Sequence, residues 1–178
     1  MSRDLTADLI GVSREQYGPE HRSHLLEQYK LYLEMTDRIS QRRQTANTFL
    51  LTVNTALVAL LGIAFPNTLG LLGTVWYTIV GLAGIVLCYT WRRLIRSYGD
   101  LNTAKFKVVH EIEQALPIRP CDAEWKAVGE GRNPKLYLPF THVEPRIPWL
   151  FTGLYLMLIA SSIISLVVSL LGVLSRGS

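Results

Sequence analysis

Two long uncharged stretches, joined by a three-residue link, restrict the folds open to this chain. Residues 45–65 contain 21 amino acids without a charge, and residues 69–91 contain another 23. An α-helix needs about 20 predominantly apolar residues to cross the hydrocarbon core of a bilayer. A soluble protein would need a large structure to bury two such helices, and 178 residues cannot supply one. We therefore interpret residues 45–91, linked by Pro66-Asn67-Thr68, as a transmembrane hairpin.

A third apolar run adds one more predicted span. Residues 147–174 hold 28 uncharged amino acids, which are enough for one tilted helix and too few for two. The chain length fits one compact unit rather than a string of separate domains. We expect an all-α integral membrane protein with three transmembrane helices, at residues 45–65, 69–91 and 147–174.

The basic residues predict the orientation of these spans. Of the 18 lysines and arginines, seven lie in residues 1–45, ten lie in residues 92–146, and Arg176 follows the third run. Lysine and arginine accumulate on the cytoplasmic side of membrane proteins. We therefore expect a cytoplasmic N-terminus, a cytoplasmic segment 92–146 and a C-terminus outside. The net charge of +4 at pH 7 follows from this topology, so no nucleic-acid partner is expected.

The polar parts of the chain divide into helical and loop-rich segments. Residues 1–21 are predicted to form a flexible N-terminus. Residues 22–44 and 92–116 carry apolar side chains at helical spacing. We expect them to be long amphipathic cytoplasmic stalk helices that continue the first two spans and pack antiparallel. Residues 117–146 are rich in proline and predict a loop-rich cytoplasmic module with a short helix capped by Asp122.

Small residues line one face of the second span. Steps of three and four residues place these positions on that face: Gly70, Gly73, Tyr77, Gly81, Gly84 and Cys88. Lipid supplies no hydrophobic drive for helices to associate, so close approach between small residues has to do so. Gly73, Gly81 and Gly84 are therefore candidates for packing against the first span or for an oligomer interface. The sequence leaves both open.

Polar side chains inside the spans form a second group of candidates. Ser162, Ser165 and Ser169 share one face of the third span, where hydroxyl groups can pack helices together or line a wet pore. Asn54 lies deep in the first span and needs a hydrogen-bond partner. A neighbouring helix or a symmetry-related subunit could supply that partner, so Asn54 joins the glycines as a candidate for span packing or for an oligomer interface.

Five residues mark the junction between the stalks and the membrane. Arg42, Arg43 and Asn47 lie at the start of the first span, and Arg92 and Arg93 follow the second. Arginine side chains at this depth can bind anionic lipid headgroups or pair with nearby carboxylates. We expect these residues to form a lipid-headgroup or junction site.

The sequence carries no recognisable motif for catalysis or for cofactor binding. No Asp, Glu, His, Lys or Arg lies within the predicted spans, which argues against ion-coupled transport. His21 and His24 lie one turn apart but lack further metal ligands, so a solvated surface explains them better. Neither a phosphate-binding loop nor a nucleophile elbow occurs. We therefore expect no enzyme activity, no cofactor and no metal site.

The stalk-to-membrane junction resembles the RipA family of bacterial octameric membrane proteins. The residues that carry the likeness are Thr36-Asp37-Arg38, Arg42-Arg43, Ala46, Asn47 and Phe49. The order of hairpin, polar segment and final span is also similar, and the resemblance covers about residues 22–174. It implies a homo-oligomer in the bacterial inner membrane, with eight subunits as the candidate number. A looser similarity is to two-span membrane effectors of bacterial conflict systems, from which this chain differs by its third span.

Three functions remain open at this point. The leading expectation is a non-enzymatic, ring-like homo-oligomer that acts as a membrane scaffold or adaptation factor, with membrane lipids as further partners. An oligomeric channel or membrane-permeabilising effector, lined by Ser162, Ser165 and Ser169 or by Asn54, is the second. The third is an accessory subunit that recruits a cytoplasmic protein through the loop-rich module 117–146.

Overall fold

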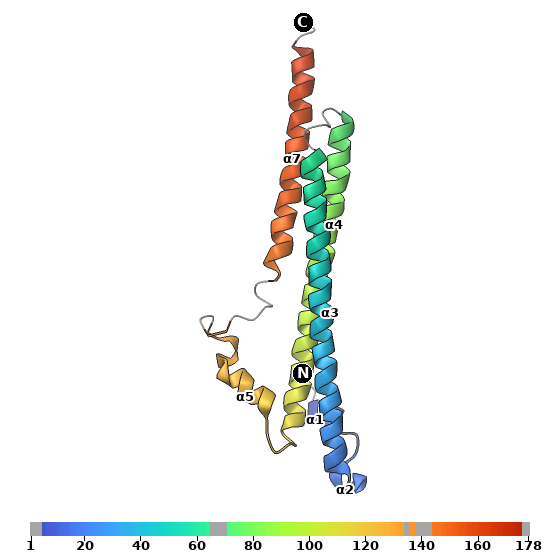
Figure 1. Cartoon of the computed structure of the whole chain (residues 1–178), viewed down its shortest axis with the longest axis vertical. Helices are drawn as coiled ribbons and strands as arrows, with labels where there is room; N and C mark the ends of the chain where they lie inside the picture. Colours follow the sequence, from blue (N-terminus) through green and yellow to red (C-terminus); the bar gives the residue numbers. More distant parts are fainter. Residues whose placement is uncertain (1–4, 65–70, 134–135, 138–143, 176–178) are drawn as a thin grey trace. The chain divides into compact units, whose positions relative to one another are not determined.

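The computed structural model is built from α-helices (Figure 1). It describes residues 5–64, 71–133, 136–137 and 144–175, and these residues contain no β-strand. The predicted link Pro66-Asn67-Thr68 and Gly70 lie outside the described residues. The elements in chain order are α1 (Leu5–Leu9), α2 (Arg14–Tyr17), α3 (His21–Ala64), α4 (Leu71–Glu113), α5 (Pro120–Ala127), the 3-10 helix η2 (Gly129–Gly131) and α7 (Arg146–Leu174). The all-helical fold class is thus confirmed.

Three of these helices are long and apolar enough to cross a membrane. They are α3, α4 and α7; α3 and α4 hold the described residues of the first two uncharged runs, and α7 contains the third. Helices α3 and α4 continue without a break beyond their apolar parts, since neither contains proline and α4 ends before Pro117 and Pro120. The prediction of three candidate spans is confirmed.

The chain divides into two compact units. The first comprises residues 1–44 and 97–140 and is called here the polar unit. The second comprises residues 45–96 and 141–178, contains the three apolar runs, and is called the apolar unit. Helices α3 and α4 each contribute residues to both units.

In the polar unit, α3 and α4 lie antiparallel. The Tyr29 hydroxyl donates to Glu113, whereas the ring of Tyr32 lies 4.5 Å from the ammonium of Lys105. The buried line of α4 here is Lys105, Val109 and Glu113. The apolar side chains at helical spacing in residues 92–116 had predicted an apolar packing face, yet two of these three buried side chains are charged.

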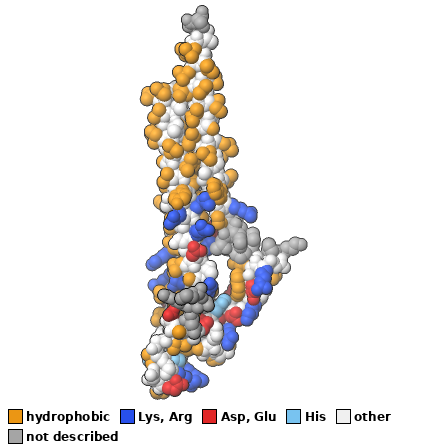
Figure 2. Space-filling view, turned by 180° about the vertical axis from the view of Figure 1, so that it is seen from behind, with side chains coloured by type: hydrophobic (Ala, Val, Ile, Leu, Met, Phe, Trp, Pro, Cys, Tyr) orange, Lys and Arg blue, Asp and Glu red, His pale blue; other side chains and the backbone are white. Residues whose placement is uncertain are grey.

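The apolar unit has a core shared by all three of its helices. Its buried members are Leu50, Leu61, Tyr77, Cys88, Trp91, Ile95, Phe151 and Tyr155. The rings of Trp91 and Phe151 lie 6.2 Å apart, which brings α4 and α7 together at this point. Large apolar side chains also cover the outside of this unit (Figure 2), and Leu72 and Met157 are 87% and 68% exposed. Such an exterior suits a lipid environment.

Two glycines of α4 allow α7 to approach closely. A Cβ atom added at Gly81 would lie 2.7 Å from the Cγ1 of Ile159. At Gly84 it would meet the ring of Tyr155 closer than 3.0 Å. Gly81 and Gly84 therefore pack against α7, whereas the sequence had left the first span and an oligomer interface open.

Substitution of Gly84 tests this close approach. Gly84→Ala should lower the free energy of unfolding by about 1–3 kcal/mol, because the added methyl group displaces the buried ring of Tyr155. The matched control is Gly153→Ala on α7, where a Cβ meets nothing within 4 Å. Thermal unfolding in mild detergent should show a lower Tm for the first variant alone. Equal Tm values for the two variants would contradict the packing described here.

Candidate functional site

A buried amide connects the three helices of the apolar unit. Asn54 on α3 is fully buried. Its side-chain oxygen accepts hydrogen bonds from the Tyr155 hydroxyl at 3.1 Å and from the Cys88 thiol at 3.4 Å. Its Nδ2 donates to the backbone oxygen of Leu50 at 2.8 Å. One side chain thus bonds to its own helix, to α4 and to α7.

These contacts decide between the two partners considered for Asn54. The sequence left open whether a neighbouring helix or a second subunit satisfies its hydrogen bonds. The chain itself supplies a partner for both the side-chain oxygen and the side-chain nitrogen. Asn54 therefore packs the spans within one subunit, where it has little capacity left for another copy.

A second asparagine lies two turns earlier on the same face of α3. The Asn47 side-chain oxygen accepts a 2.8 Å hydrogen bond from the indole nitrogen of Trp91, which is almost fully buried. This bond joins the start of the first apolar run to the end of the second. The sequence grouped Asn47 with the junction arginines, and the structure places its oxygen in contact with α4.

The small residues and serines separate into buried and exposed positions. Gly73, Gly81 and Gly84 are buried on α4. Ser162 is also buried, and its backbone oxygen accepts a hydrogen bond from the Thr74 hydroxyl at 3.4 Å. The serines that follow it, Ser165 and Ser169, are exposed on α7. The predicted serine stripe therefore does not share one environment.

The junction arginines belong to both units. Arg42 and Arg43 fall in the polar unit, whereas Arg92 and Arg93 fall in the apolar unit. The guanidinium carbon of Arg92 lies 4.0 Å from the ring centroid of Trp149, the geometry of a cation–π contact between α4 and α7.

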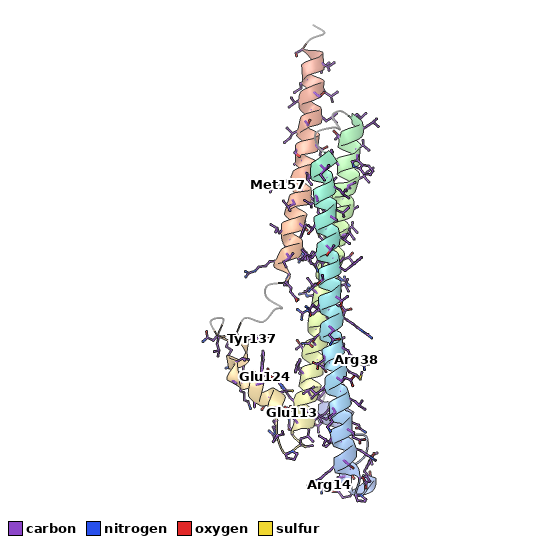
Figure 3. All side chains as sticks on the ribbon, viewed as in Figure 1. Arg14, Arg38, Glu113, Glu124, Tyr137 and Met157 are labelled. Atoms are coloured by element: carbon purple, nitrogen blue, oxygen red, sulfur yellow. The ribbon has the colours of Figure 1, made fainter. Side chains whose placement is uncertain are left out.

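A carboxylate that the sequence did not single out organises the polar unit. Glu113 is fully buried at the end of α4 (labelled in Figure 3). It accepts hydrogen bonds from the Tyr29 hydroxyl at 2.7 Å and from the backbone amides of Cys121 and Asp122 at 2.9 and 3.0 Å. These amides belong to the first turn of α5, so Glu113 caps that helix from a different element.

The observed cap corrects the prediction for α5. The helix begins at Pro120, and no side chain next to its start caps it. Asp122 lies inside the helix and pairs with Lys126 at 2.7 Å. Proline is suited to the first turn because it has no amide hydrogen to satisfy, and the remaining amides are satisfied by Glu113.

The surroundings of Glu113 favour its ionised form. Burial by itself raises the pKa of Glu113. The hydrogen bonds from Tyr29 and from the two α5 amides together lower it by more than burial raises it, so the pKa is below the ordinary 4.5. Burial and the adjacent carboxylate raise the pKa of the Tyr29 hydroxyl. Burial raises the pKa of Cys121, so its thiol is not an activated nucleophile.

The two histidines of the N-terminal region pack around one tyrosine. The hydroxyl of Tyr17 lies 2.8 Å from Nδ1 of His24, and its ring meets those of His21 and His24 edge-on. Among the described residues, no cluster of three or more His, Cys, Asp or Glu side chains is placed to hold a metal ion. This arrangement supports a structural role for the histidine pair.

Comparison with known proteins assigns the chain to a family. The model of the octameric membrane protein family matches residues 26–173, which cover most of the first and third candidate spans and all of the second. The chain belongs to this octameric membrane protein family. The predicted membership of a family of octameric membrane proteins is therefore confirmed, and the description indicates a membrane homo-oligomer. Searches of the curated proteins and of the solved structures found no match.

A double-mutant cycle tests the Asn54 contacts in this family member. Asn54→Leu combined with Tyr155→Phe should show a coupling energy of about 0.6 kcal/mol, with an upper limit of about 1.7 kcal/mol. Tyr155→Phe removes the hydroxyl while keeping the ring against Gly84. The free energy of unfolding in mixed micelles gives the coupling. A cycle with Asn47→Leu in place of Asn54→Leu should be additive, and coupling of equal size in both cycles would contradict the assignment.

Substitution of Glu113 tests the cap of α5. Glu113→Gln should weaken the docking of α5 by about 1–3 kcal/mol, because the charge-assisted hydrogen bonds to Cys121 and Asp122 become neutral ones. Amide hydrogen exchange of residues 121–127 should rise accordingly. Glu111→Gln is the matched control, since the described hydrogen bonds of Glu111 are to Thr6 and Gln114, which lie outside α5.

The same measurement has an expected pH dependence. A carboxylate whose pKa is lowered by folding stabilises the structure above its ordinary pKa, and that stabilisation is lost as the pH falls through the lowered value. Protection of α5, corrected for intrinsic exchange, should therefore fall below about pH 4.5 in the native protein. The Glu113→Gln variant should lack this step; an unchanged step would show that another group causes it.

Proposed function

We propose that this chain is the non-enzymatic subunit of a ring-like homo-octamer in the bacterial inner membrane, where it acts as a membrane scaffold or adaptation factor. The observation that carries the proposal is the match to the octameric membrane protein family over most of the chain. The distribution of lysine and arginine supports a cytoplasmic polar unit, with the N-terminus inside and the C-terminus outside.

The subunit interface has to use surfaces that the protomer leaves open. Gly81, Gly84 and Asn54 are occupied inside one subunit by α7 and α4. The outer side of α3 instead carries small residues, all of them exposed: Thr48, Thr52, Thr55, Ala59 and Gly62. Their spacing of three and four residues places them on one face, here called the α3 small face.

The chemistry of the α3 small face suits helix packing in a membrane. The hydroxyl of Thr52 donates to the backbone oxygen of Thr48 at 2.9 Å, and that of Thr55 donates to Leu51 at 2.8 Å. These hydroxyl groups are satisfied within their own helix, so a neighbour needs only to fit the surface. A Cβ at Gly62 would meet nothing within 4 Å, which leaves room for a second helix.

A closed ring of identical subunits requires two different faces on each subunit. The second candidate face lies on α7, where Ser165, Ser169 and Gly172 are exposed. We propose that this face of one subunit packs against the α3 small face of the next. The outer side of α4 carries bulky groups instead, among them Trp76, Ile79 and Val86, and suits lipid contact.

Two other functions keep some support. Exposed hydroxyl groups at Ser165 and Ser169 are compatible with a wet lining, so an oligomeric channel is the second candidate. The segment around α5 exposes Ile118 and Trp125, which favours an accessory subunit that binds a cytoplasmic protein. Ser162 and Asn54 carry less weight for a channel, since both are buried within the protomer.

A bulky substitution on the α3 small face tests the assembly. Ala59→Phe should break the octamer into smaller species. The added phenyl group destabilises each subunit interface by about 1–3 kcal/mol, and the octamer contains that interface many times over. Native mass spectrometry of the nanodisc-extracted complex gives the subunit number. Leu60→Phe is the matched control, since Leu60 is exposed next to Ala59 but lies off the small face.

Each outcome of this experiment separates the proposals. An intact octamer in Ala59→Phe would exclude the α3 small face as the interface. A monomer or dimer in the native protein would contradict the ring itself. Recordings in planar bilayers with the intact assembly distinguish a scaffold, which should be silent, from a channel, which should conduct.

A further inference from the structure

The positive charge of the apolar unit is concentrated at one end. Residues 45–96 and 141–178 contain five arginines and one carboxylate, Glu144. Three of the arginines follow the second apolar run on α4: Arg92, Arg93 and Arg96. The contact of Arg92 with Trp149 brings this end of α4 next to the first turn of α7, which begins with Arg146.

Arg92 and Arg146 have no acidic partner among the described residues. Two exposed arginines of the polar unit do have one: Arg38 pairs with Glu34 at 2.7 Å, and Arg132 pairs with Glu130. The ring of Trp149 covers only one face of the Arg92 guanidinium. The N–H groups along the edge of a guanidinium point away from a ring so placed, and they match the geometry of a phosphate group.

The start of α7 adds to this positive field. The helix has 29 residues, so its backbone dipole is fully developed. Its first turn contains no acidic residue, and no side chain caps it. An anion placed here would therefore be attracted by the helix terminus as well as by Arg92 and Arg146.

An apolar strip continues directly from these charges. On α7 the residues after Trp149 expose Leu150 and Met157, at 65% and 68%. Between them lies Gly153, whose position leaves nothing within 4 Å of a Cβ. Met157 points away from α3 and α4 (Figure 3). A ligand that matches both features has a phosphate group at one end and a hydrocarbon chain at the other.

We infer that Arg92, Arg146 and Trp149 bind the phosphate headgroup of an anionic phospholipid whose acyl chain lies along α7 over Leu150, Gly153 and Met157. The inference rests on the proposed placement of this end of the spans at the inner face of the membrane. An anionic lipid neutralises the uncompensated arginines, whereas a zwitterionic lipid brings its own positive group to the same place. The site thus prefers anionic over zwitterionic lipid.

Lipid retention by the full-length protein tests this site. The protein is reconstituted in nanodiscs that contain equal amounts of phosphatidylglycerol and phosphatidylcholine, and native mass spectrometry counts the lipids that each subunit keeps. The native protein should retain phosphatidylglycerol preferentially. Arg146→Gln, a change at an exposed helix start, should reduce that preference about tenfold, as expected for the loss of one charged hydrogen-bond donor. Arg92→Lys keeps the charge and should reduce it less.

Two controls make the result decisive. Arg38→Gln removes an arginine that already pairs with Glu34 and should leave lipid retention unchanged. An equal loss in Arg38→Gln, or equal retention of both lipids by the native protein, would overturn the site. Millimolar inorganic phosphate should not displace the lipid, and displacement would show a general anion site without a role for the acyl chain.

The same spectra separate this site from the proposed assembly. Subunit number and bound lipid are read from one measurement. A smaller assembly that still prefers phosphatidylglycerol would contradict the octamer and leave the lipid site in place. An octamer without lipid preference would contradict the site alone.

Discussion

The amide of Asn54 is the constraint on which the apolar unit depends. An unsatisfied amide among apolar side chains is costly, because no water is present to replace a lost partner. Its oxygen is satisfied by groups from two other helices, Cys88 on α4 and Tyr155 on α7. The hydroxyl of Tyr155 reaches Asn54 only because its ring lies directly over Gly84. The small residues of α4 and the polar residue of α3 thus serve one packing arrangement.

Glu113 has a corresponding role in the polar unit. Apolar contacts hold helices together but do not fix their register, whereas a hydrogen bond has one geometry. The carboxylate joins α3 through Tyr29 and the first turn of α5 through two backbone amides. In both units the side chain that fixes the arrangement is polar, buried and fully engaged. The remaining surfaces are therefore the ones left for lipid and for neighbouring subunits.

The sequence predicted the helices and the family, but not which surfaces meet. Run length and charge were sufficient for three spans, because the thickness of a bilayer sets the length of helix that crosses it. Periodicity placed Gly81 and Gly84 on one face of α4, yet it could not tell α7 from α3 as the neighbour. Glu113 escaped notice because hydrophobic patterns treat a carboxylate as exposed. Its partners lie 84 and 8 residues away, separations that no local pattern reveals.

The sequence separations of the Asn54 contacts imply an order of membrane insertion. Asn54 and Cys88 are 34 residues apart and meet as soon as the hairpin forms, whereas Tyr155 follows 101 residues after Asn54. During synthesis the hairpin therefore enters the bilayer while the side-chain oxygen of Asn54 still lacks the hydrogen bond from Tyr155. Docking of α7 supplies that bond, so a chain whose last helix has failed to insert leaves the Asn54 side-chain oxygen with the Cys88 thiol as its interhelical donor and without the Tyr155 hydroxyl.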